Sequence, residues 1–162
     1  MILSAFTFVH VVISLIGIAA GLVVMAGFLA EKQLSGWTGW FLWSTVLTSV
    51  TGYFFPYHGF KPSYVVGAIS LFFLAIALFA LYKRQLAGVW RTTYVITAMI
   101  ALYLNVFVLV AQLFMKVPAL KALAPTQSEP PFKITQLTVV ILFFFLTIFS
   151  TIRFRNTAVR PA

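Results

Sequence analysis

Few side chains in this 162-residue sequence could bind a cofactor or move a proton. The chain has two histidines, two acidic residues and no cysteine. The lack of cysteine excludes disulfides, thiolate metal sites, iron–sulfur clusters and covalently attached haem. The candidates for binding a ligand or cofactor are polar residues scattered among long apolar runs: His10, His58, Asn105, Gln112, Lys116, Glu129 and Gln136.

The two histidines allow at most one bis-histidine haem. Imidazole is a common axial ligand, so haem b held between His10 and His58 is one hypothesis. His10 lies about 7 Å inside the start of its predicted helix, at roughly 1.5 Å per residue, whereas His58 follows a proline in a loop. The two rings reach the same depth only if that loop folds inward. No residue is predicted to be catalytic, and the histidines are predicted metal ligands only if haem is bound.

His10 belongs to a regular stripe of small and polar residues in the first apolar run. The spacings of three, four, three and four put the stripe on one face of a helix. Its glycines form a G-x-x-x-G pattern, which lets a neighbouring helix approach closely in a membrane. His10 is then either a hydrogen-bonded packing residue or a ligand facing a cavity. The other members of the stripe, predicted to pack helices, are Thr7, Ser14, Gly17 and Gly21.

A second polar stripe runs along the fourth apolar run. Asn105 and Gln112 are seven residues apart, so one helix face presents both. An amide left unpaired in hydrocarbon is costly, and both amides must find partners. Two interpretations stay open: hydrogen bonds between helices, or polar anchors for a bound head group or ring.

Glu129 lies in a proline-rich loop between the last two apolar runs. We expect its carboxylate to pair with Lys116, Lys121 or Lys133 at a membrane interface. Thr126 and Glu129 match the spacing of a helix capping box, but two prolines follow at once and argue against a helix starting at Thr126. The loop is either an ordinary connector or a lid over the polar residues.

The elements that must position these residues are transmembrane helices. Hydrophobic residues make up 62% of the chain and charged residues 8%, too few to cover a water-soluble globule. We predict one all-α membrane helix bundle of five spans, about 5–30, 37–55, 64–82, 90–115 and 134–152. The second run is the least apolar because of its hydroxyl side chains. A four-span variant with a re-entrant second segment stays open.

The basic residues predict the orientation of the bundle. Seven fall on the side of the C-terminus and four on the other side, so the C-terminus is predicted to be cytoplasmic and the N-terminus outside. The four tryptophans fall at the more basic side, as in an interfacial aromatic belt. All seven candidate residues then lie toward the outer, periplasmic side, where they could form one pocket.

Several functional classes are excluded by what the chain lacks. Neither glutamate lies in a predicted span and there is no aspartate, so ion-coupled transport is disfavoured. The net charge of +9 comes from basic loops that flank apolar spans, and nucleic-acid binding is not expected. The leading hypothesis is a membrane binding protein or accessory subunit with a periplasm-side polar pocket for a small apolar ligand or cofactor. The alternatives are a haem b or quinone electron-transfer protein and a purely structural subunit that contacts lipid, other membrane subunits or further copies of itself.

Three segments carry a resemblance to a known group of proteins. TSVTGYFFP, ALYLNVFVLVAQ and KVPALKALAPTQSEPPF resemble a family of small multi-span bacterial inner-membrane proteins to which no activity is assigned. The resemblance covers most of the chain. It implies a location in the bacterial inner (cytoplasmic) membrane and assigns no role to any residue.

Overall fold

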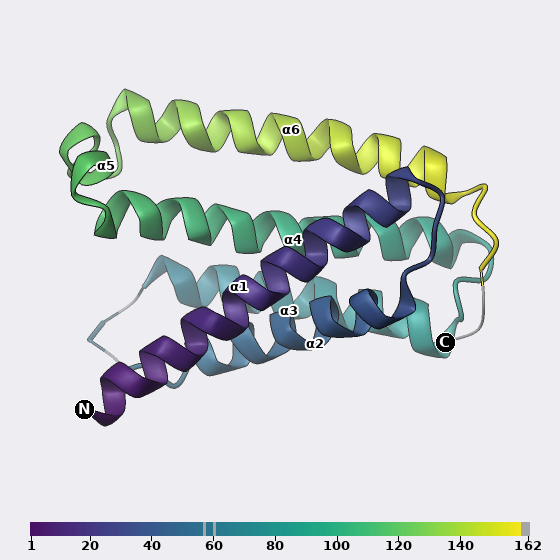
Figure 1. The fold of residues 1–162 in the computed structure, drawn as a ribbon, viewed down its shortest axis with the longest axis horizontal. Helices are drawn as coiled ribbons and strands as arrows, with labels where there is room; N and C mark the ends of the chain where they lie inside the picture. Colours follow the sequence, from purple (N-terminus) through teal and green to yellow (C-terminus); the bar gives the residue numbers. More distant parts are fainter. Residues whose placement is uncertain (57, 60, 160–162) are drawn as a thin grey trace.

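The computed structural model describes residues 1–56, 58–59 and 61–159, and in this part the chain is an all-α bundle. Five long helices lie roughly along one axis, and a short one closes one end (Figure 1). A π-helical turn, η1 (Phe79–Lys83), continues the third helix. The six α-helices are α1 (Ile2–Leu29), α2 (Ser35–Gly52), α3 (Pro62–Leu78), α4 (Val89–Lys116), α5 (Pro118–Leu123) and α6 (Pro130–Phe154).

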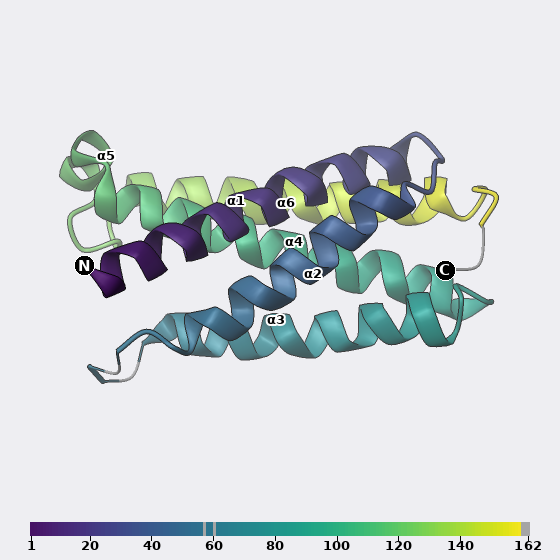
Figure 2. The ribbon, with the colours of Figure 1, turned by 60° about the horizontal axis from the view of Figure 1, so that its bottom comes forward.

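The connections between helices fall at the two ends of the bundle. The start of α1, the α2–α3 connection and α5 lie at one end, which we call the N end (Figures 1 and 2). The α1–α2 and α3–α4 connections and the residues after α6 lie at the other, the C end. The two groups of basic residues therefore occupy opposite ends, as the sequence predicts: Lys61, Lys116, Lys121 and Lys133 at the N end, and Lys32, Lys83, Arg84, Arg91, Arg153 and Arg155 at the C end. Arg160, the seventh predicted for that side, lies outside the described residues.

Four helices are long and apolar enough to cross a membrane, so the chain is a multi-pass membrane protein by length and composition. They are Ile2–Leu29, Pro62–Lys83, Val89–Lys116 and Pro130–Phe154. The second predicted span, α2, is not among them, because hydroxyl and glycine residues lower its hydropathy. Much of that polarity is turned inward: Thr38, Ser44, Thr45 and Ser49 are buried.

Prolines move several helix boundaries away from the predicted positions. Helix α6 begins at Pro130 and α3 at Pro62, because proline has no N–H to satisfy and suits the first turn of a helix. Helix α2 ends at Gly52, before the predicted residue 55, since the position preceding Pro56 disfavours helical backbone. The short helix α5, which was not predicted, also begins at a proline.

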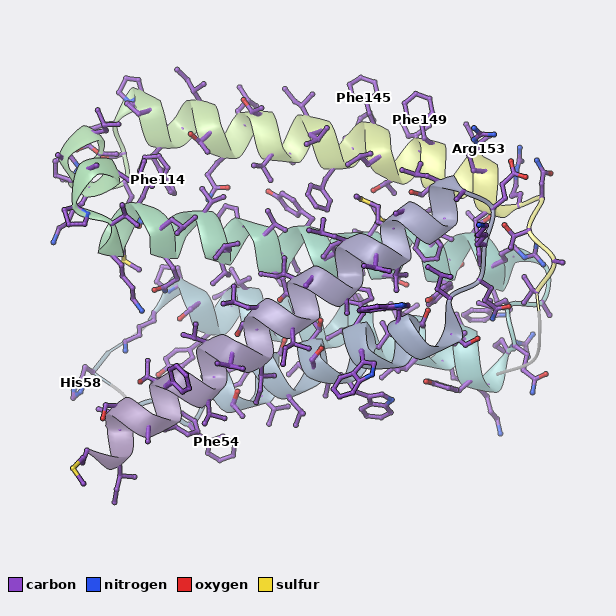
Figure 3. The ribbon with its side chains drawn as sticks, in the orientation of Figure 1. Phe54, His58, Phe114, Phe145, Phe149 and Arg153 are labelled. Atoms are coloured by element: carbon purple, nitrogen blue, oxygen red, sulfur yellow. The ribbon has the colours of Figure 1, made fainter. Side chains whose placement is uncertain are left out.

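Helix α4 is the central element of the bundle, and α6 lies at its edge. α4 packs against α1, α3 and α6 and contributes Tyr94, Ala98 and Leu102 to the core, each at most 2% exposed. Helix α6 contacts only one side of the bundle, so most of its apolar surface stays uncovered. Phe145 and Phe149 on α6 point away from the other helices (Figure 3). In a membrane this surface faces lipid or another protein.

Candidate functional site

The glycines of the predicted stripe on α1 lie at the closest contacts between helices. A Cβ atom on Gly21 would come 2.5 Å from Leu102 Cδ1 on α4 and 2.9 Å from the Phe41 ring on α2. A Cβ atom on Gly17 would come 3.2 Å from Ser44 Oγ. Both glycines thus lie where a neighbouring helix approaches α1 closely. The other two stripe residues bond within α1: Thr7 donates to the Leu3 carbonyl and Ser14 to the His10 carbonyl.

His10 bonds across the interface between α1 and α2. Its Nδ1 atom is 2.8 Å from Oγ1 of Thr51, and the Thr51 hydroxyl donates to the Leu47 carbonyl of its own helix at 2.6 Å. The Phe55 ring meets the imidazole edge-to-face, with centroids 5.0 Å apart. The imidazole is half-buried and contacted by Thr51 and Phe55, which favours the interpretation of His10 as a packing residue. Its Nε2 atom has no hydrogen-bond partner among the described residues.

Asn105 repeats the same arrangement one layer deeper. Its Nδ2 atom donates to Oγ1 of Thr45 at 3.1 Å, and the Thr45 hydroxyl donates to the Phe41 carbonyl at 2.7 Å. Thr45 and Thr51 thus each donate their hydroxyl hydrogen to their own helix, α2, and accept an N–H from a neighbouring helix. These bonds join α4 and α1 to α2, and they satisfy polar groups that hydrocarbon would leave unpaired.

The two remaining predicted amides, Gln112 on α4 and Gln136 on α6, do not meet at one site. Gln136 Nε2 on α6 donates to the Phe107 carbonyl at 3.1 Å, while its Oε1 atom is buried without a partner in the described part. Gln112 is half-buried and makes no hydrogen bond with any described residue. Lys116, exposed at the end of α4, lies within electrostatic range of the His10 ring.

Glu129 does not pair with any of the three lysines, so that prediction is wrong. Its carboxylate accepts the Thr126 hydroxyl at 2.8 Å, the Thr126 N–H at 3.2 Å and the Ser128 N–H at 3.1 Å. Desolvation raises the pKa of Glu129, but these hydrogen bonds outweigh it and hold the pKa below the usual value of 4.5. The carboxylate therefore stabilises the turn that precedes α6 by hydrogen bonds within that turn. The one ion pair in the described part of the chain joins Glu31 to Arg153 at 3.1 Å, at the C end.

His58 is exposed in the α2–α3 connection, away from the helix bundle (Figure 3). No interaction joins it to His10 within the described residues. The described part also contains no cluster of three or more His, Asp or Glu side chains that could hold a metal ion. The seven predicted residues thus share the N-end half of the bundle, but no hydrogen bond joins any two of them.

A cavity of about 170 Å³ lies at the opposite, C end of the bundle, and sequence reasoning missed it. Helices α1, α2, α4 and α6 and the η1 turn contribute to its wall. Residues 32–35 of the α1–α2 connection line one side. The principal side chains of the wall are Val24, Phe28, Thr38, Leu81, Tyr94 and Phe154.

Two buried polar groups face this cavity. Tyr94 is 2% exposed and Thr38 is 6% exposed, and their hydroxyl groups lie close enough to interact. The Tyr94 ring packs edge-to-face on Phe28, which in turn contacts the Phe154 ring at 4.8 Å. Nothing in the sequence pairs Tyr94 with Thr38, because they come from different helices and neither interrupts an apolar pattern. The π-helical turn η1 in the cavity wall is a feature often found at functional sites. It is visible in the backbone of the structure and not in the sequence.

Polar contacts draw the helix ends together around this cavity. The Arg91 guanidinium on α4 donates to the carbonyls of Arg155 at 2.8 Å and Thr157 at 2.9 Å. These carbonyls follow the end of α6, where a cation is favoured by the helix dipole. Together with the Glu31–Arg153 pair, Arg91 anchors the end of α6 beside α1 and α4.

A second hollow is an open groove on the outside of the bundle between α1 and α2. It is formed by Ile13, Ile16, Gly36, Gly39, Trp40 and Trp43. The groove is almost entirely apolar, and both of its tryptophans are exposed. Such a surface is suited to contact with lipid.

Comparison with family models, with curated proteins and with solved structures finds no match to this chain. The resemblance to small bacterial membrane proteins is therefore supported only at the level of class. By composition the chain is a multi-span helical membrane protein.

Proposed function

We propose that this protein binds a small, largely apolar molecule in the cavity at the C end of the bundle. The observation that carries the proposal is that cavity: apolar side chains from several helices enclose about 170 Å³ around the buried Tyr94–Thr38 pair. An engineered protein cavity of about 150 Å³ is large enough to hold benzene. Small-molecule sites commonly combine such apolar walls with a few polar groups that orient the ligand.

This proposal keeps the binding function expected from the sequence but changes its location. The polar groups of the N-end half, His10 and Asn105, already bond to threonines of α2. A ligand there competes with bonds that stabilise the bundle, whereas a ligand in the C-end cavity displaces no bond between helices. The N-end cluster stays a second candidate because the His10 Nε2 atom has no hydrogen-bond partner among the described residues. A haem or quinone bound by His10 would need a second ligand or anchor other than His58, which is exposed.

Mass spectrometry of molecules retained after gentle purification tests the proposal. The variant Val24→Phe replaces a small side chain in the cavity wall with an aromatic ring and should reduce the amount of retained ligand. Ile13→Phe is the matched control, since residue 13 lies on the same helix but lines the external groove. Circular dichroism of both variants checks that the bundle still folds. Equal retention by the wild type and Val24→Phe contradicts binding at this site.

A role as an accessory subunit is the second candidate, and the uncovered face of α6 favours it. Phe144, Phe145 and Phe149 are 62%, 51% and 55% exposed on that face. Photo-crosslinking amino acids at positions 145 and 149 should capture another protein or a second copy if the face is an interface. Crosslinks to lipid alone argue against this candidate.

We further propose that α2 is the fifth span, that the N end faces the periplasm and that the C end faces the cytoplasm of a bacterial inner membrane. The excess of basic residues at the C end supports this orientation. Because the chain has no cysteine, single cysteines introduced at positions 58, 128, 33 and 87 report their side directly. Labelling of 58 and 128 from outside, with 33 and 87 protected, is the expected result. If α2 is re-entrant, positions 33 and 58 lie on the same side.

A further inference from the structure

The hydrogen count of the Tyr94–Thr38 pair defines what the cavity can bind. Two hydroxyl groups carry two hydrogens, and a hydrogen bond between them would use only one. Thr45 on α2 and Thr97 on α4 give their hydrogens to carbonyls of their own helices, those of Phe41 and Thr93. Thr38 makes no such bond, and no other acceptor is bonded to Tyr94 in the described part of the chain. One O–H hydrogen is therefore unspent at the cavity wall.

The charge around the cavity has one sign. Lys32 lines it, and no acidic side chain does. The neighbouring Glu31 bonds to Arg153 instead. A buried hydroxyl donor and a lysine in the cavity wall both favour a hydrogen-bond acceptor with negative charge, because charge-assisted hydrogen bonds are the stronger kind.

The size of the cavity limits the rest of the ligand. Sites for drug-sized molecules usually measure about 300–1,000 Å³, and this one measures about 170 Å³. Four buried apolar residues form much of the remaining wall: Val24, Phe28, Leu81 and Phe154. Gln33, Leu34, Ser35 and Tyr82 complete it. One aromatic ring or a short aliphatic chain fits this volume, and a two-chain lipid does not.

We infer that the cavity binds a small apolar carboxylate, whose oxygen accepts the spare hydroxyl hydrogen of the Tyr94–Thr38 pair and whose charge faces Lys32. This inference rests on the proposed function and names the ligand class of the same site. An aromatic acid the size of benzoate is the simplest molecule that meets all three conditions of donor, charge and volume.

Equilibrium dialysis of labelled benzoate against the protein in lipid nanodiscs tests the inference. Empty nanodiscs give the lipid background, and benzylamine is a probe of similar size and opposite charge. We expect saturable benzoate binding that exceeds benzylamine binding at least tenfold. The double variant Tyr94→Phe/Thr38→Val keeps the ring and the side-chain shapes but removes both hydroxyls, and it should weaken benzoate binding about tenfold, as loss of a hydrogen bond to a charged group does.

Matched variants separate the site from general effects on folding. Lys32→Gln should also weaken benzoate binding. Tyr103→Phe on the same helix and Lys83→Gln at the same end of the bundle should leave it unchanged, because neither lines the cavity. The inference is overturned if benzylamine binds as well as benzoate, or if the double variant Tyr94→Phe/Thr38→Val binds benzoate like the wild type. In those cases loss of bound ligand in Val24→Phe still supports the proposed function. If neither probe binds and no molecule is retained from the membrane, both the proposed function and this inference fail.

Discussion

The Nδ1 atom of His10 lies 2.8 Å from Oγ1 of Thr51 and donates a hydrogen to it. The direction follows from the next bond. Thr51 has one hydroxyl hydrogen and gives it to the Leu47 carbonyl at 2.6 Å, a contact that needs a hydrogen because a carbonyl only accepts. Thr51 can then only accept from His10. A neutral His10 ring is therefore protonated on Nδ1, and its lone pair is on Nε2.

Nitrogen-15 NMR should detect this tautomer of His10. In a His58→Gln variant, only one histidine remains in the protein. At a pH where the ring is neutral, we expect a protonated Nδ1 and an unprotonated Nε2. Thr51→Val removes the acceptor and should shift the population toward the other tautomer. A wild-type ring protonated on Nε2 contradicts the bonding direction.

Gly21 should tolerate no side chain. The Cβ atom of Gly21→Ala would come 2.5 Å from Leu102 Cδ1 and 2.9 Å from Phe41, so the buried contact between three helices must open. Overpacking of this kind costs about 1–3 kcal/mol. Gly39→Ala on α2 is the matched control, because its Cβ atom meets nothing within 4 Å. Thermal unfolding in detergent should show a lower Tm for Gly21→Ala than for Gly39→Ala.

The Asn105–Thr45 bond should contribute modestly to stability. Hydrogen bonds between membrane helices are worth about 0.5–2 kcal/mol, a modest amount because the polar groups find other partners when the helices separate. A double-mutant cycle of Asn105→Leu and Thr45→Val, measured by reversible unfolding, isolates this contribution. A coupling free energy of zero means that the 3.1 Å contact does not stabilise the folded state.

Glu129 should titrate below an ordinary glutamate. Its folded-state pKa is depressed by hydrogen bonds from Thr126 and Ser128, which outweigh desolvation. The carboxylate's contribution to the stability of the turn is fully present above the usual pKa of 4.5 and is lost as the pH falls through the lower folded pKa.

Carbon-13 NMR of labelled glutamate can follow this titration without overlap in a Glu31→Gln variant, because the chain has only two glutamates. We expect a midpoint below 4.5 in this protein. Removing one donor with Thr126→Val should raise it. A midpoint at or above 4.5, unchanged in Thr126→Val, contradicts the arrangement seen in the turn.

Composition and periodicity determined much of this architecture. Transfer from water to hydrocarbon is nearly additive over residues, so the apolar runs alone indicated a multi-span helical protein. Helical periodicity put Gly17 and Gly21 on one face, and a face of small residues has few uses in a membrane other than close packing. The positions of the basic residues between these runs also determined which loops share an end.

Tertiary structure decided which partner each polar group takes. Whether Asn105 bonds to Thr45 or to a ligand depends on the rotation and depth of helices that lie sixty residues apart in the chain, and local pattern carries no information about either. The same holds for Glu129, which bonds within its own turn instead of reaching a lysine. The cavity at the C end exists because several helices leave space around Tyr94 and Thr38. Space left between helices is a property of their packing and not of any single segment.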